Sequence, residues 1–159
     1  MVFYGALSGE AWSTENPIGQ LWQRFNQFFD GNPEWVKKHT IRPEIGYEVN
    51  IWNEAESQET GRFYTFVGVE VDSLDDLPLE VVGKVLPAGT FAHAIPKGQQ
   101  ITTWEKDLYE AWLPGSGYEL APIGDYHYQL QVYEDGRFKG VGDLLEESEI
   151  DVYTPVNEA

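Results

Sequence analysis

Two segments of the chain alternate apolar and polar residues with a period of two, which is typical of a β-strand with two different faces. They cover residues 47–54 and 128–135 and align with each other without a gap. One face of each segment is apolar, and it carries Tyr47, Val49 and Ile51 in the first and Tyr128, Leu130 and Val132 in the second. The opposite face is polar and aromatic, and it carries Glu48, Asn50 and Trp52 in the first and Gln129, Gln131 and Tyr133 in the second. The pattern predicts two related strands.

A helical pattern precedes each of these strands. Apolar residues recur at the spacing of one helix face, clearly at Ile18, Leu21, Trp22, Phe25, Phe28 and Phe29, and less regularly at Ile101, Trp104, Leu108, Ala111 and Trp112. Thr14 and Glu15 before Asn16-Pro17 favour a helix start, because proline is tolerated in a first turn. We therefore expect one helix in each half of the chain.

Shorter strands complete the pattern. We expect strands at residues 2–7 and 90–95 ahead of the helices, and at 62–71 and 149–156 after the paired strands. Residues 79–86 join the halves and are expected to extend the strand at Thr90. The prediction is an α+β fold, a single domain over residues 1–159 built from two diverged β-α-β-β units, at about 1–78 and 79–159. Such units would pair about a pseudo-twofold axis, giving a curved antiparallel sheet with two helices and a central cleft.

Charge narrows the range of partners. The chain has 27 acidic and 10 basic side chains and a formal net charge of −17. This charge repels phosphate backbones and disfavours direct binding to nucleic acid. No apolar run approaches the roughly 20 residues of a membrane span, and the N-terminus lacks the basic and apolar regions of a secretory signal. We expect a cytoplasmic protein that binds neither nucleic acid nor a membrane.

The sequence is poor in signals for catalysis. It has no cysteine, so disulfides, thiolate nucleophiles and cysteine-ligated metals are excluded. Gly115-Ser116-Gly117 lacks the spacing of a nucleophile elbow, and the preceding Pro114 indicates a turn. No glycine-rich phosphate loop occurs, and His39, His93 and His127 are too scattered to indicate a metal site. We expect no cofactor, although the abundant carboxylates leave acid–base chemistry open.

Aromatic residues make up 14% of the chain and include six Trp. Tyr and Trp combine an apolar face with a polar tip, which suits a ligand pocket. A small-molecule site in the predicted cleft is therefore the function that the composition favours, although the same aromatic residues could also fill two helix–sheet cores.

Several segments together resemble the GyrI-like effector-binding domains, which also form the drug-sensing part of AraC-type bacterial transcription activators and occur as stand-alone integron-cassette proteins. The resemblance spans nearly the whole chain and is carried most strongly by Trp112-Leu113-Pro114-Gly115-Ser116-Gly117-Tyr118-Glu119-Leu120. Supporting segments are residues 18–22, 66–71, 86–92 and 150–156.

The resemblance implies an SH2-like form of the duplicated fold and a central aromatic pocket that in many members takes hydrophobic cations. In those members a glutamate on the strand after the second helix meets the positive charge. Gln131, followed by Val132 and Tyr133, occupies that position here, and Glu48 or Glu119 could replace the carboxylate. The predicted ligand-binding residues are Tyr47, Glu48, Asn50, Trp52, Tyr64, Phe66, Phe91, His93, Trp104, Glu119, Gln131, Tyr133 and Tyr153.

Three functions remain open at this point. The first is a stand-alone module that binds an aromatic or amphipathic small molecule, with cations among the candidates. The second, implied by an enzymatic branch of the same family, is a hydrolase of reactive cyclopropane-bearing toxins. The third is an acidic protein-interaction module. The name of the family suggests a gyrase-type topoisomerase as its partner, and a chain this acidic could mimic nucleic acid on a basic surface. The sequence shows no helix-turn-helix segment, so any regulatory output would need a protein partner.

Overall fold

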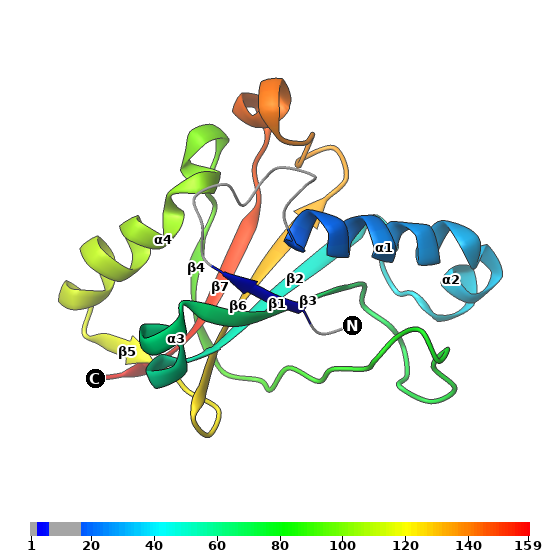
Figure 1. The fold of residues 1–159 in the computed structure, drawn as a ribbon. Coiled ribbons are helices and arrows are strands. Elements are labelled where there is room, and N and C mark those ends of the chain that lie inside the picture. The colour runs from blue at the N-terminus through cyan, green and yellow to red at the C-terminus, as the bar shows by residue number, and fades with distance from the viewer. Residues whose placement is uncertain (1–2, 7–16) are drawn as a thin grey trace.

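The computed structural model describes residues 3–6 and 17–159, and it shows helices packed on an antiparallel sheet (Figure 1). The strands are β1 (Phe3–Ala6), β2 (Ile45–Asn53), β3 (Arg62–Gly68), β4 (Thr90–Ala94), β5 (Tyr118–Leu120), β6 (Tyr126–Glu134) and β7 (Asp151–Glu158). They lie in the order β1-β3-β2-β6-β7-β4, and β5 pairs with β7. The predicted α+β class is confirmed, and the two strands predicted from the period of two lie side by side at the centre of the sheet.

The helices come from both halves of the chain. The α-helices are α1 (Pro17–Gly31), α2 (Pro33–His39), α3 (Glu54–Thr60) and α4 (Trp104–Lys106). Three short 3₁₀ helices are η1 (Gly98–Thr102), η3 (Leu113–Gly115) and η4 (Gly142–Glu147), and η2 (Asp107–Trp112) is a π-helix. Residues 98–115 therefore form one nearly continuous helical segment of changing pitch. The described part of helix α1 runs from Pro17, and the proposed start residues Thr14, Glu15 and Asn16 lie outside the described residues, so the predicted helix start stays a prediction.

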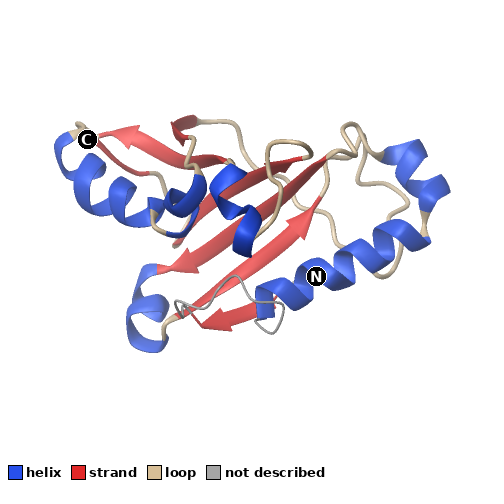
Figure 2. Ribbon diagram, turned by 90° about the horizontal axis from the view of Figure 1, so that it is seen from above, coloured by secondary structure: helices blue, strands red, loops and turns tan. Residues whose placement is uncertain are grey.

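The register of the central strands determines which side chains share a face. Glu48 of β2 lies opposite Gln131 of β6, and Asn50 lies opposite Gln129. Because side chains alternate along a strand, these four share one face of the sheet. Ile18 of α1 and Trp104 of α4 border the same cavity as these side chains, so both helical elements cover that face. Figure 2 shows the helices arranged along the strands.

A buried hydrophobic cluster lies under the helical segment 98–115. Ile101 and Trp104 from the helical segment pack with Tyr133, Ile150 and Val152 from the sheet region, and all five are less than 10% exposed. Burying an aliphatic or aromatic side chain of this kind contributes about 1.5–3 kcal/mol. This core holds the helical segment 98–115 against β6 and β7, and so defines one wall of the cavity.

The opposite face of the sheet carries a separate aromatic group. The rings of Phe91 and Tyr153 lie 6.4 Å apart edge to face, and His93 stacks on Tyr153 at 4.4 Å. His93 Nε2 also lies 2.7 Å from Asp151 Oδ1. These rings come from β4 and β7, which pair with each other.

Some predicted elements differ from the observed ones. Residues 79–86 contain no strand, and Leu79 is fully exposed there, so the expected extension of the strand at Thr90 is wrong. The helices α2 and α3 were not predicted. The origin of the two halves by duplication, the pseudo-twofold axis and the single-domain organisation stay predictions. Among the described residues, no helix combines the length and apolar character needed to cross a membrane.

Candidate functional site

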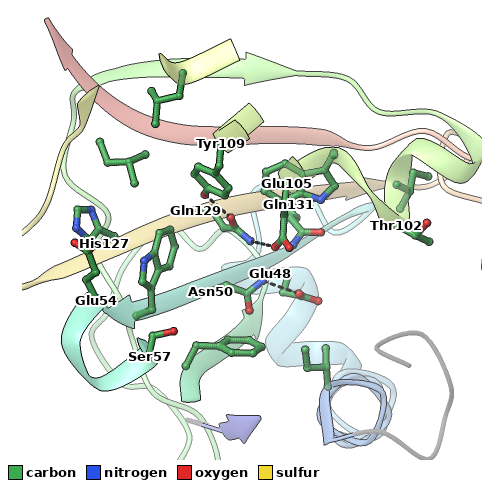
Figure 3. Close-up of a pocket in the computed structure, with 17 residues that line it drawn as sticks. Glu48, Asn50, Glu54, Ser57, Thr102, Glu105, Tyr109, His127, Gln129 and Gln131 are labelled. Carbon is green, nitrogen blue, oxygen red and sulfur yellow. Dashed lines mark hydrogen bonds between the residues drawn. The ribbon is translucent and has the colours of Figure 1, made fainter. Parts of the chain in front are cut away.

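A cavity of about 940 Å³ lies on the helix-covered face of β2 and β6, between α1 and the helical segment 98–115 (Figure 3). Its floor is polar and its walls are largely apolar or aromatic. The lining residues are Ile18, Glu48, Asn50, Trp52, Glu54, Ser57, Phe63, Ile101, Thr102, Trp104, Glu105, Tyr109, Leu113, Leu120, His127, Gln129 and Gln131. Cavities of about 300–1,000 Å³ are typical of small-molecule sites.

Glu48 is a buried carboxylate on the floor of this cavity, with only 3% of its surface exposed. Trp22 Nε1 donates a hydrogen bond to its Oε2 at 2.8 Å, and Asn50 Nδ2 donates to its Oε1 at 3.0 Å. The Thr65 hydroxyl donates to Asn50 Oδ1 at 2.6 Å, which fixes the orientation of that amide. The carboxylate is therefore held in place by neutral donors.

Burial raises the pKa of Glu48 above its ordinary value. The hydrogen bonds from Trp22 and Asn50 oppose this shift, and the negative charge of Glu105 adds to it. A buried carboxylate is costly unless a cation or several donors compensate it. In this site neutral donors contact the carboxylate, and no Lys, Arg or His side chain of the described residues forms an ion pair with it.

A second hydrogen-bonded group connects the helical segment to β6. The Tyr109 hydroxyl donates to Gln129 Oε1 at 2.9 Å, and Gln129 Nε2 donates to Glu105 Oε1 at 3.2 Å. Burial is the main cause that raises the pKa of Tyr109 far above its ordinary value, so the hydroxyl keeps its proton and acts as a donor. The hydrogen bond from Gln129 places the Glu105 carboxylate on the cavity wall opposite α1 (Figure 3).

Aromatic rings form the end of the cavity near α3. Trp52 stacks on His127 with ring centroids 5.6 Å apart, and it meets Tyr109 edge to face at 6.3 Å. Trp52 and His127 lie opposite each other in the β2–β6 register, which explains the stack. Tyr109 belongs to the π-helix η2, and such wide turns occur frequently at functional sites. The rings offer broad apolar faces to a planar ligand.

The charges around the cavity are of one sign. Glu48, Glu54 and Glu105 line it, and the described lining residues include neither Lys nor Arg. The described residues contain no group of three or more His, Cys, Asp or Glu arranged to hold a metal ion. The site is thus an anionic pocket with an aromatic end.

Five of the predicted ligand-binding residues come together around the cavity, namely Glu48, Asn50, Trp52, Trp104 and Gln131. Tyr133 lies on the same face of β6, two residues beyond Gln131, and is buried in the core, where its hydroxyl donates to Gln131 Oε1 at 2.9 Å. Its ring contacts Trp22 edge to face at 5.5 Å. Ligand contact by the five lining residues remains a prediction, while Tyr133 lies in the core beside the cavity floor and holds the Gln131 amide through its hydroxyl.

The other predicted residues are not brought to this cavity. The alternation of β2, β3, β4 and β7 directs Tyr47, Tyr64, Phe66, Phe91, His93 and Tyr153 to the opposite face of the sheet. Glu119 is exposed on β5, where its neighbour Leu120 lines the cavity instead. Aromatic residues occur on both faces of this sheet, and their residue type alone does not distinguish one face from the other.

Sequence reasoning missed several lining residues. His127 and Gln129 share the strand face of Gln131, so the period of two contained the signal for both. Glu105 and Tyr109 lie four residues apart beside Trp104, which is the spacing of neighbours on a helix surface. Ser57 and Glu54 come from α3, a helix that the apolar pattern does not indicate.

Comparison with known families agrees with this picture of a ligand pocket. The profile of the Cass2 family, described as integron-associated effector binding protein, matches residues 3–156. The chain belongs to this family. A search of curated protein sequences gave no match. The predicted resemblance to stand-alone, integron-cassette effector-binding proteins is confirmed, and membership indicates small-molecule binding as the general class of function.

As an integron-associated effector binding protein, the chain needs a cavity that an effector can enter, and the cavity above β2 and β6 is large enough for one. Gln131 stands at the position where the resemblance implies a glutamate, and Glu48 lies directly opposite it in the register. The carboxylate is therefore present on this floor, on the neighbouring strand.

Proposed function

We propose that this protein binds an aromatic or amphipathic cation in the cavity between α1 and the helical segment 98–115, with Glu48 as the counter-charge. The observation that carries the proposal is the Glu48 carboxylate, which is 3% exposed, lines the cavity and has no cationic partner among the described residues. A cationic ligand supplies the charge that the buried carboxylate lacks.

The arrangement of donors around Glu48 supports a ligand at the remaining side of the carboxylate. Trp22 and Asn50 each occupy one oxygen, and each carboxylate oxygen can accept more than one hydrogen bond. An ion pair in a pocket shielded from water is stronger than one at the surface, because the effective dielectric constant is lower. Glu105 adds a second negative charge to the same cavity.

The aromatic end supports a planar group on the ligand. Trp52 and Tyr109 both line the cavity and neither is fully buried, so part of each ring is accessible to a planar ligand. A cation over an aromatic face gains about 0.5–2 kcal/mol. These contacts select for a molecule that combines an aryl group with a positive charge.

Replacement of Glu48 tests the proposal. Titration with a naphthylethyl-dimethylammonium ion, followed by calorimetry or tryptophan fluorescence, should show that Glu48→Gln weakens binding by at least about tenfold. The neutral carbon isostere of the same compound should bind wild type and variant equally, because it has no charge to lose. Glu59→Gln, at an exposed position of α3, is the matched control and should bind the cation as wild type does.

The proposal is wrong if the cation and its neutral isostere bind wild-type protein with the same affinity. It is also wrong if a folded Glu48→Gln variant retains full affinity for the cation. Far-ultraviolet circular dichroism of both variants establishes that the fold is intact.

A further inference from the structure

The amide side chains on the cavity floor differ in how completely the protein satisfies them. Asn50 and Gln129 each use both the oxygen and the nitrogen of the amide in hydrogen bonds with other side chains. Gln131 accepts one hydrogen bond at Oε1 from the Tyr133 hydroxyl, at 2.9 Å. Its Nε2 makes no hydrogen bond with the described residues. This nitrogen is also absent from the fully buried unpaired polar atoms of the described residues, so it retains accessible surface. Because Gln131 lines the cavity, this N–H group is open to a ligand.

The neighbours of Gln131 determine which way the amide faces. Tyr133 lies beside Gln131 on the same face of β6 and belongs to the core, not to the cavity lining, so Oε1 points toward the core and Nε2 toward the cavity. The reverse orientation would place the amide oxygen on the side of the Glu48 carboxylate, where two acceptors would repel each other. The amide is therefore a donor at the floor.

This donor lies beside the carboxylate. Glu48 and Gln131 are directly opposed in the β2–β6 register. Opposed residues of antiparallel strands have their Cβ atoms about 4.5–5.5 Å apart. The floor thus presents an anionic acceptor and a neutral donor next to each other, and Figure 3 shows both side chains at the cavity.

We propose that the site selects cations that carry both an N–H group and a nearby oxygen acceptor, as in amino alcohols and amino amides, over quaternary ammonium ions. This inference rests on the proposed function and specifies its ligand class. A protonated amine donates to Glu48, and a hydroxyl or carbonyl oxygen close to the nitrogen accepts from Gln131 Nε2. A quaternary ammonium ion has no N–H for the carboxylate, and a ligand without the oxygen leaves the Gln131 donor desolvated and unpaired.

Unpaired polar groups are a strong source of selectivity, because a site built to form a hydrogen bond rejects the analogue that cannot form it. A glutamate at position 131 would remove this donor and add a second acceptor. The pair of Glu48 with Gln131 therefore favours a ligand that has both a protonated amine and an oxygen acceptor. Two carboxylates would instead favour a ligand by its positive charge, whether or not it carries the oxygen.

Three ligands on one naphthyl scaffold test the inference. The first has a dimethylamino group on the carbon next to a carbinol, the second lacks the hydroxyl, and the third is the trimethylammonium form of the amino alcohol. Calorimetry on wild type should rank the amino alcohol first, with the deoxy compound and the quaternary ion each weaker by about fivefold or more. Gln131→Leu keeps the size of the side chain and removes the donor, so it should bind the amino alcohol and its deoxy analogue equally. Gln23→Leu, at an exposed position of α1, should behave as wild type.

Gln131→Glu provides a second variant that keeps an acceptor for Tyr133. It should lose the preference for the hydroxyl and bind the quaternary ion more tightly than wild type does. If the amines bind in a Glu48-dependent way but the hydroxyl contributes equally in wild type and Gln131→Leu, this inference is overturned while the proposed function stands. If none of the three ligands binds wild type, both are overturned.

Discussion

At the scale of single residues, the ionisation of Glu48 controls when the cavity attracts a cation. Burial raises its pKa above the ordinary value of 4.5, and the charge of Glu105 raises it further. Only the deprotonated form provides the counter-charge. Affinity for a quaternary cation, which does not itself titrate, should therefore increase with pH through the raised pKa, by up to about tenfold per pH unit below it.

Calorimetry from about pH 5 to about pH 8 measures this dependence, and buffers of different ionisation enthalpy reveal the proton that Glu48 releases on binding. The Glu48→Gln variant should bind the cation weakly and should show a smaller rise of affinity with pH than wild type over the same range. A flat profile for wild type, with no proton release, would contradict the assignment of Glu48 as the titrating group.

Gly46 is a second residue on which the site depends. A Cβ at this position would lie 2.9 Å from Trp22 Cη2 and 3.2 Å from Trp22 Cζ3. Gly46→Ala should displace the indole that donates to Glu48, lower the free energy of unfolding by about 1–3 kcal/mol and weaken cation binding. Gly31→Ala is the control, because nothing lies within 4 Å of a Cβ there. Urea denaturation and ligand titration of both variants check this, and equal behaviour would contradict it.

At the scale of elements, the helical segment 98–115 forms one wall of the cavity and is hydrogen-bonded to β6. The Tyr109 hydroxyl donates to Gln129 on the floor, and Gln129 donates to Glu105 of the same segment. Tyr109→Phe removes the first hydrogen bond and leaves Gln129 Oε1 without its donor. We expect a loss of about 1 kcal/mol in stability and a few-fold loss in cation affinity, measured by urea denaturation and calorimetry. Tyr126→Phe, on the exposed end of β6, should change neither.

The elements themselves could largely be predicted from the sequence, because their signals are local. The apolar spacing from Ile18 to Phe29 gave α1, and the alternation within residues 47–54 and 128–135 gave β2 and β6 to within two residues. The helix α3 carries the acidic sequence of residues 54–60 and has no buried side chain, so no apolar pattern marks it. A helix without an apolar face has no periodic pattern of apolar residues by which it could be predicted from the sequence.

The candidate site was less predictable than the elements, because it depends on which face of the sheet the helices cover. The period of two groups Glu48 with Asn50 and Trp52, but it does not say whether that face or the face of Tyr47 is covered. Long-range packing decides this, through contacts such as Trp22 against Tyr133 and Trp104 in the core beneath the helical segment. Phe91 and Tyr153 were therefore as plausible from the sequence as Trp52, although the structure places them on the other face.

At the scale of the whole molecule, the net charge of −17 should influence how fast a cationic ligand reaches the cavity. The field of many carboxylates raises the local concentration of cations, and salt screens it over a Debye length of about 10 Å at 0.1 M. The association rate of the naphthyl cation, measured by stopped-flow tryptophan fluorescence, should fall several-fold between about 0.02 M and about 0.5 M salt. The neutral isostere should associate at a constant rate, because it experiences no steering. Equal salt dependence of the two ligands would show that the surface charge does not guide the ligand to the cavity. A salt dependence confined to the cation would show that the acidic surface as a whole attracts the cation, in addition to Glu48 and Glu105.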